Sequence, residues 1–291
     1  MPAKLISIGE LIDHSWEKYR EHIGPFLSIS GWTLIVAVLN VIAVAFYPTA
    51  SKIVLGDSIT SIETFGIILY AISSYVVAPI INIYVLVGLI RLIKSIMAGR
   101  GVSLSQNFKE ILKRFWPVAL ISFMYVLIII LGGLIPLLPA GVFALLSLII
   151  HSDALLSFSN ILLILGVFGA TFLGIRWAVE FYLAPYLVAQ DDEKIRASLF
   201  SSRKLINGRF WSVFLRIVAP KVVFILFGIL MIWLLNMIVV VIFSGVSGLN
   251  IDLQVRLTSY TDSVIPLLAT VFIQPLIILS DVLLLKSLKG E

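Results

Sequence analysis

The chain has 291 residues, of which 60% are hydrophobic and only 13% are charged, with a net charge of +5 and no cysteine. A soluble domain carries about 45–50% apolar and about 25% charged residues, so the long apolar runs of this chain exclude an ordinary soluble protein. The absence of cysteine excludes disulfides, thiolate catalysis and cysteine-based metal sites.

Residues 1–25 are expected to form an amphipathic helix at the start of the chain. Acidic residues such as Glu10 and Glu17 interrupt its apolar positions, and no compact apolar segment precedes a small-residue cleavage site, which excludes a cleavable signal peptide. The apolar side chains recur at three- and four-residue steps: Leu5, Ile8, Ile12, Trp16, Tyr19 and Ile23.

Six later segments are long and apolar enough to cross the hydrocarbon core, which needs about 20 residues for each helix. The stretch Ala140–Ile150 is also apolar but too short to span, and it is expected to form a re-entrant or interfacial turn. The fold class is therefore all-α, as a polytopic bundle forming a single integral membrane domain over 1–291. The predicted spans are 26–46, 65–90, 117–137, 161–187, 218–243 and 264–285.

Two further amphipathic helices are expected on the same side of the membrane, over 104–115 and 195–206. Each of the three amphipathic helices precedes an odd-numbered span, with an aromatic or proline break between them, and each even-numbered span carries a proline. This pattern favours a threefold internal repeat. The alternative is that Trp and Pro simply mark membrane interfaces. The predicted interfacial anchors are Trp16, Trp116 and Trp211.

Basic residues predict the orientation. Lys and Arg gather in the N-terminal segment, in the loops after spans two and four and in the C-terminal tail, whereas only Lys52 and Arg256 lie on the other side. The positive-inside rule therefore places both termini in the cytoplasm. Basic residues beside spans also meet anionic lipid, which explains the positive charge without nucleic acid.

Charged and polar residues within the spans are the candidate functional residues. Arg176 and Glu180 are four apart and share one face of span four, where an unpaired charge would cost about 2.5–3.5 kcal/mol. Their candidate partners on spans two and six are Asn82, Gln274 and Asp281. The functional hypothesis is a polar site between helices two, four and six, in which Arg176 holds an anionic group. The structural hypothesis is a buried ion pair that fixes helix packing.

Catalytic and metal-binding motifs are missing from the sequence. It contains no His-Glu-x-x-His, no Gly-x-Ser-x-Gly and no phosphate-binding glycine loop. His14 lies among acidic residues of the N-terminal helix, a mixture more typical of a solvated helix face than of a cation site. We therefore expect no catalytic residue, no metal and no cofactor. A membrane-embedded enzyme using Glu180 and Asp281 as an acid–base pair is a remote alternative.

The segment between about 176 and 211 resembles a known family. It is similar to the six-helix membrane domain at the N-terminus of some glycerophosphoryl diester phosphodiesterases, and to related stand-alone membrane proteins of bacteria and archaea. The resemblance implies no catalytic residue, because the phosphodiesterase activity of that family belongs to a separate soluble barrel for which this chain has no room. The matching residues are Arg176-Trp177, Ala184-Pro185, Ala197-Ser198, Ser202 and Leu205 to Trp211, with Ser15-Trp16 and Tyr19 before the first span.

Together these features predict a non-enzymatic integral membrane protein that organises or modulates membrane lipid or a partner protein. Its expected partners are membrane lipids, with a protein partner or a second copy of the chain as further possibilities. The alternative is a small-molecule or lipid transporter that uses the polar cluster between helices two, four and six.

Overall fold

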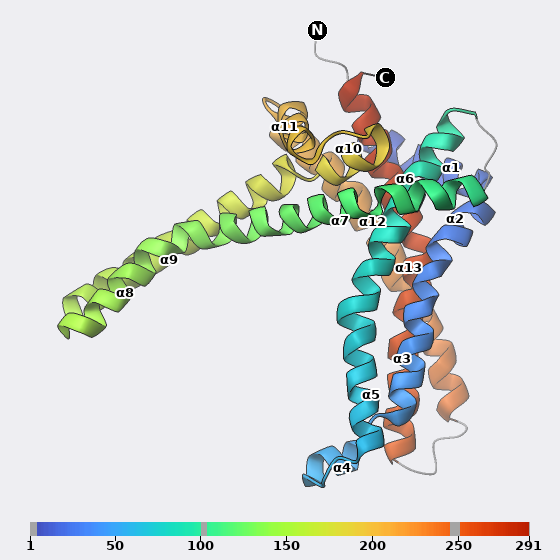
Figure 1. Cartoon of the computed structure of the whole chain (residues 1–291), viewed down its shortest axis with the longest axis horizontal. Helices are drawn as coiled ribbons and strands as arrows, with labels where there is room; N and C mark the ends of the chain where they lie inside the picture. The colour runs from blue at the N-terminus through green and yellow to red at the C-terminus, as the bar shows by residue number, and fades with distance from the viewer. Residues whose placement is uncertain (1–4, 100–103, 245–250, 291) are drawn as a thin grey trace. The chain divides into compact units, whose positions relative to one another are not determined.

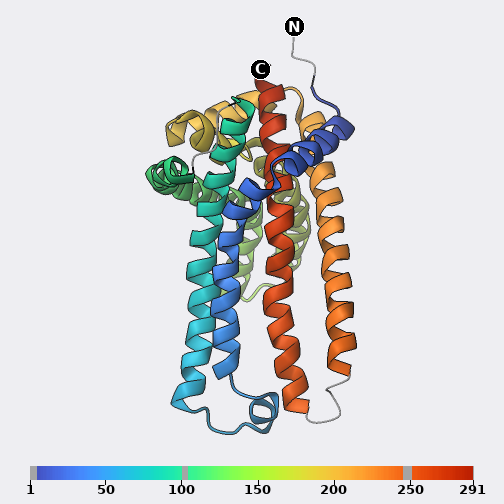
Figure 2. The same ribbon diagram turned by 90° about the vertical axis from the view of Figure 1, so that its right-hand side faces the viewer.

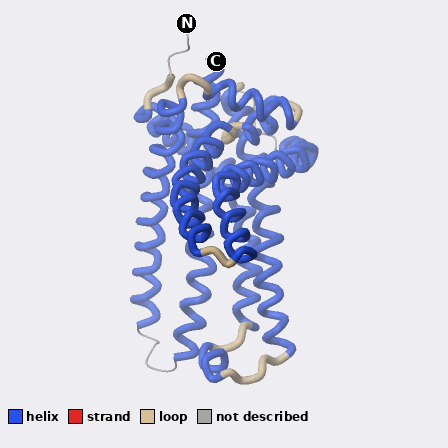
Figure 3. The backbone as a smooth tube through the Cα atoms, turned by 90° about the vertical axis from the view of Figure 1, so that its left-hand side faces the viewer, coloured by secondary structure: helices blue, strands red, loops and turns tan. Residues whose placement is uncertain are grey.

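The structure is a computed structural model that describes residues 5–99, 104–244 and 251–290. Within these ranges the chain is helical and contains no strand (Figure 3). Six of the helical segments are long and apolar enough to cross a membrane, which confirms the predicted all-α class and the six candidate spans, while the interfacial position of the amphipathic helices and the threefold repeat stay predictions. The protein is thus an all-helical, multi-pass membrane protein.

The chain divides into two compact units. The first unit contains Met1–Phe115 and Leu215–Glu291, and the second contains Trp116–Phe214. Two long helices, α7 (Leu104–Leu134) and α12 (Phe210–Ser244), contribute residues to both units.

The first unit contains four of the six candidate spans, three of which pack closely side by side (Figures 1 and 2). The first closely packed span combines α2 (Ile23–Ser30), a 3-10 turn (Gly31–Thr33) and α3 (Leu34–Phe46). The second combines α5 (Ser61–Ile72), a π-helical segment (Ser73–Val77) and α6 (Ala78–Met97). The third is α13 (Ile251–Lys289), and the short helix α4 (Ala50–Leu55) follows α3.

Helix α1 (Ile8–Glu21) covers one end of this unit. Ser7 and Glu10 form a capping box at its start, and its buried face carries Leu11, Ser15 and Tyr19 against α13 and α2. The Ile6 amide donates to Ser287 Oγ at 2.9 Å. This contact places both described ends of the chain at the same end of the first unit, opposite α4 (Figure 2).

The second unit is a helical hairpin followed by two shorter helices. Residues of α7 continue through a 3-10 turn (Ile135–Leu137) into α8 (Leu138–Ile150), and α9 (Asp153–Glu180) returns along them. Ser159 Oγ donates to the Ala140 carbonyl at 2.8 Å, and Tyr125 donates to the Ala178 carbonyl at 2.9 Å. Helices α10 (Ala184–Asp191) and α11 (Ile195–Ile206) then lead to α12.

Three expectations about local structure are wrong. The segment Ala140–Ile150 is a helix that extends span three rather than a turn. The break at Pro117 is absent, because α7 continues through this residue, as membrane helices tolerate proline where other groups satisfy the freed carbonyl. The candidate span Asp153–Asp191 contains the predicted span 161–187, but it is not one continuous helix, because α9 ends at Glu180 and α10 begins at Ala184, next to Pro185.

Helices α3 and α5 approach each other so closely at Gly66 that a side chain has no room. A Cβ added at Gly66 would lie 2.7 Å from the Phe46 carbonyl carbon and 2.8 Å from its oxygen. These are backbone atoms, which cannot rotate away as the end of a side chain can. Glycine at this position therefore sets the distance between the first two spans.

We expect Gly66→Ala to lower the free energy of unfolding by about 1–3 kcal/mol, because the added methyl group forces α3 and α5 apart. Thermal unfolding in detergent, followed by tryptophan fluorescence, measures the change. The matched control is Gly9→Ala in α1, where nothing lies within 4 Å of an added Cβ. Equal unfolding temperatures for the two variants would show that the close approach at Gly66 contributes nothing to stability.

Candidate functional site

The candidate site of the second unit lies where α9 ends. The last residue of α9, Glu180, is 8% exposed. Its carboxylate accepts a hydrogen bond from Arg176 Nε at 2.8 Å, so the pair predicted from its four-residue spacing is formed. The pair occupies the last turns of α9, within the candidate span Asp153–Asp191, and the helix is interrupted directly after Glu180.

Helix α11 completes this site from a distance of more than twenty residues along the chain. Ser202 Oγ donates to the Glu180 carbonyl at 2.7 Å and thereby satisfies one of the orphan carbonyls at the end of α9. The next residue, Arg203, places Nε 3.3 Å from Glu180 Oε2. This contact is an ion pair without hydrogen-bond geometry, and Glu180 Oε2 is buried without a hydrogen-bond partner. One carboxylate therefore faces two guanidinium groups.

Two cavities meet at these charges. One, of about 280 Å³, is mainly apolar and also has Arg176, Glu180 and Asn207 in its wall; its hydrophobic lining is Phe172, Ile175, Ile206, Phe210 and Trp211. The other, of about 250 Å³, is lined by Arg176, Glu180, Phe200, Arg203, Lys204 and Asn207. Arg176, Glu180 and Asn207 belong to both walls. An apolar hollow thus adjoins a cationic one, and this pairing matches the two ends of an amphiphile.

The local chain accounts for this arrangement. Helix α11 ends at Ile206, and Asn207-Gly208 turns the chain, with Gly208 at a φ of 79° that a side chain disfavours. Phe210 and Trp211 then begin α12, with their ring centroids 5.3 Å apart. Trp211 is 67% exposed. Exposed aromatic rings beside basic residues are typical of a membrane interface.

The other predicted interfacial anchors lie on different helices. Trp16 on α1 is half-exposed and packs edge-on against Phe227, with ring centroids 6.0 Å apart. Trp116 on α7 is 76% exposed. All three tryptophans therefore present ring surface to the surroundings, and their contact with lipid stays a prediction.

The remaining residues of the predicted polar cluster lie in the first unit. Asn82 on α6 is exposed, and Gln274 on α13 is half-buried, with its side-chain oxygen buried and without a hydrogen-bond partner. Asp281 on α13 is 1% exposed and accepts a hydrogen bond from Lys221 Nζ of α12 at 2.6 Å. The structure therefore unites Arg176 with Glu180 in one unit and pairs Asp281 with Lys221 in the other.

Sequence reasoning missed the two basic residues that pair with the predicted carboxylates, Arg203 with Glu180 and Lys221 with Asp281. Lys221 had a usable signal, since it is the single charged residue in the predicted fifth span 218–243. Arg203 had none, because it is one of several basic residues in the loop after span four and only the fold selects it. Across the described residues no group of three or more His, Cys, Asp or Glu side chains is arranged to hold a metal ion.

Comparison with known proteins gives no relative. The chain matches no family model, no curated protein and no solved structure.

The contribution of the Lys221–Asp281 ion pair to the stability of the protein can be tested. We expect Asp281→Asn and Lys221→Met each to lower the free energy of unfolding by about 3–5 kcal/mol, because each leaves a poorly exposed charge without this partner. The double variant Lys221→Met/Asp281→Leu removes both charges and should recover most of the loss. Thermal unfolding in detergent measures all three, and a double variant as unstable as the sum of the singles would contradict the coupling.

Proposed function

We propose that the protein is a non-enzymatic integral membrane protein that binds an anionic lipid where α9, α11 and α12 meet. The observation that carries this proposal is the junction of an apolar cavity with a cationic one, across walls that share Arg176, Glu180 and Asn207. A lipid headgroup bearing a negative charge fits the cationic side, and the start of an acyl chain fits the apolar side.

The charges of the site support an anionic ligand. Three cationic side chains, Arg176, Arg203 and Lys204, face a single carboxylate, that of Glu180. The Nε atoms of Arg176 and Arg203 contact the Glu180 carboxylate. About half of each arginine side chain remains exposed, so other N–H groups of the two guanidinium groups are accessible to a ligand. Arginine suits phosphate because its planar group offers paired donors. Glu180 is thus best understood as a residue that positions the two guanidinium groups.

The aromatic and apolar lining supports a lipid rather than a soluble anion. Phe172 and Trp211 are each about two-thirds exposed, and they flank the apolar cavity from α9 and α12. A free phosphate would gain nothing from these side chains, whereas an acyl chain makes van der Waals contacts with them.

The same residues support the proposal that the chain is related to the phosphodiesterase-associated membrane domains. The resemblance depends on Arg176-Trp177, Ser202 and the run from Leu205 to Trp211, and these segments supply much of the wall of the two cavities. If the relationship holds, the shared motif marks a lipid site rather than a catalytic one. The transporter alternative stays a prediction, because Arg176 and Glu180 belong to the second unit, whereas Asn82, Gln274 and Asp281 belong to the first.

The lipid proposal predicts a charge-dependent affinity. Delipidated protein in a non-ionic detergent is titrated with phosphatidylglycerol or phosphatidylcholine, and native mass spectrometry counts the bound lipids. We expect one phosphatidylglycerol to bind with preference, and Arg203→Gln/Lys204→Gln to weaken it at least tenfold, since each charged hydrogen bond contributes about 1.5–3 kcal/mol.

The matched control is Arg196→Gln, which removes an exposed cation from the same helix α11 outside both cavities. It should bind phosphatidylglycerol like the wild type. Equal affinities for the two lipids, or no difference between the double variant and the control, would refute the proposed site. Trp211→Ala should weaken both lipids equally, because it removes apolar contact and no charge.

We also propose a multi-pass location in a prokaryotic plasma membrane with both termini in the cytoplasm. The chain contains no cysteine, so single cysteines give a direct test of orientation. Ser58→Cys and Ser157→Cys should react with a membrane-impermeant maleimide added to intact cells, and Ser201→Cys should react only after permeabilisation. Labelling of Ser201→Cys in intact cells would reverse the orientation.

A further inference from the structure

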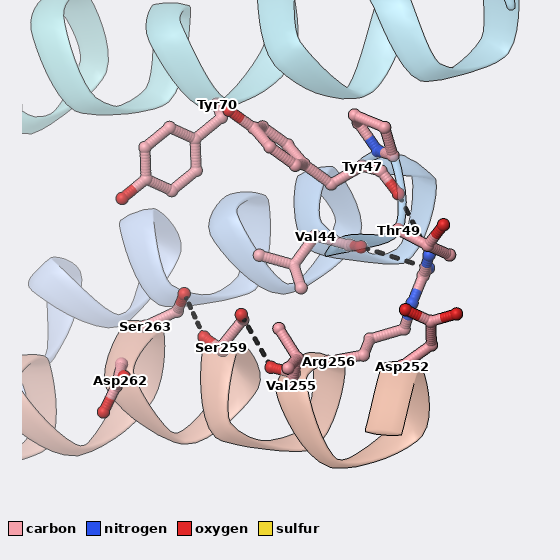
Figure 4. A pocket seen from close by; sticks show the side chains of 11 residues that line it. Val44, Tyr47, Thr49, Tyr70, Asp252, Val255, Arg256, Ser259, Asp262 and Ser263 are labelled. Carbon is pink, nitrogen blue, oxygen red and sulfur yellow. Dashed lines mark hydrogen bonds between the residues drawn. The ribbon is translucent and has the colours of Figure 1, made fainter. Parts of the chain in front are cut away.

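A third cavity, separate from the two at the lipid site, lies in the first unit at the end opposite the termini. Its volume is about 340 Å³, within the range of about 300–1,000 Å³ for small-molecule sites. The end of α3 and the turn after it form one wall, Tyr70 of α5 forms another, and α13 forms the floor (Figure 4). The sequence did not point to it, because its walls come from segments about 200 residues apart.

One end of this pocket is built from charges that already have structural roles. Arg256 donates to the carbonyl oxygens of Val44 at 3.3 Å, Ala45 at 2.5 Å and Tyr47 at 2.9 Å, and so caps the end of α3. Asp252 accepts from the backbone amide of Ser51 at 3.2 Å and from its hydroxyl at 2.8 Å. These opposite charges lie close together, and both are engaged by the protein backbone.

The other end of the pocket has a different character. Figure 4 shows Asp262, Ser263 and the Tyr70 ring at this end, away from Arg256 and Asp252. Asp262 is exposed and forms no ion pair or hydrogen bond with any described residue. Asp262 lies six positions after Arg256 on α13, which corresponds to about 9 Å along the helix axis. This end therefore carries one negative charge that the protein itself does not balance.

The remaining lining offers acceptors and aromatic surface. Ser259 and Ser263 donate their hydroxyl protons to the carbonyls of Val255 and Ser259, which leaves oxygen lone pairs for a ligand. The rings of Tyr47 and Tyr70 lie edge to face, with centroids 6.2 Å apart. A carboxylate combined with aromatic faces favours a cation, because the ring quadrupole attracts positive charge and adds about 0.5–2 kcal/mol.

We infer that this pocket binds a small organic ammonium compound. Its charged nitrogen is held near Asp262 and the Ser263 hydroxyl, and its apolar part lies against Tyr70 and Tyr47. A metal ion is a poorer occupant, because one carboxylate and two hydroxyls do not supply the six to eight oxygens that calcium takes. An anion is poorer still, because the guanidinium group of Arg256 is occupied by carbonyls.

The test uses the full-length protein in a non-ionic detergent, with benzylammonium as the probe and benzyl alcohol and benzoate as neutral and anionic counterparts. Saturation-transfer NMR and isothermal titration measure binding. We expect benzylammonium to bind with a dissociation constant in the millimolar range or tighter, and benzyl alcohol and benzoate to bind at least fivefold more weakly.

Three variants separate the parts of the site. Asp262→Asn, which changes an exposed side chain, should weaken benzylammonium at least fivefold, and Tyr70→Leu should weaken it to a smaller extent. Asp57→Asn removes another exposed carboxylate of the first unit outside the pocket and should change nothing. No binding by the folded wild type, or equal binding by Asp262→Asn and Asp57→Asn, would overturn the inference, and neither result bears on the lipid site of the second unit.

Discussion

The last carbonyl groups of an α-helix have no partner within the helix, and in a chain as apolar as this one they must find donors elsewhere. Arg256 supplies donors for the end of α3, and Ser202 supplies one for the end of α9. Each donor comes from a distant segment, so satisfying the helix end also decides which segments meet there. Both proposed ligand sites lie beside these two helix ends, where backbone, charge and aromatic rings come together.

The features of this protein that depend only on local sequence were predictable. Six apolar runs predicted six candidate spans, because the thickness of a bilayer sets a minimum length that composition alone reveals. The spacing of Arg176 and Glu180 predicted their pairing, because a separation of four residues is a contact on any helix. In both cases the geometry is local, and no knowledge of the tertiary fold was required.

The remaining features depended on contacts between distant segments or on the balance of small energies. Pro117 was expected to end a helix and does not, since the cost of one lost hydrogen bond is smaller than the cost of breaking a helix in an apolar environment. The candidate span Asp153–Asp191 contains the predicted span four, but its helix is interrupted after Glu180 before α10 begins at Ala184, which hydropathy alone does not reveal. Arg203 joins Glu180, and Lys221 joins Asp281, only through packing that spacing along the chain does not encode.

The close approach at Gly66 also affects the pocket of the first unit. Because Gly66 lets the backbone of Phe46 lie directly against α5, it also fixes the separation of the two helix segments that lead to Tyr47 and Tyr70, whose rings line the pocket. Helix α13, which carries Asp262, is joined to the end of α3 through Arg256 and to α4 through Asp252. The same glycine that sets the distance between the first two spans therefore also sets the separation of two walls of the pocket.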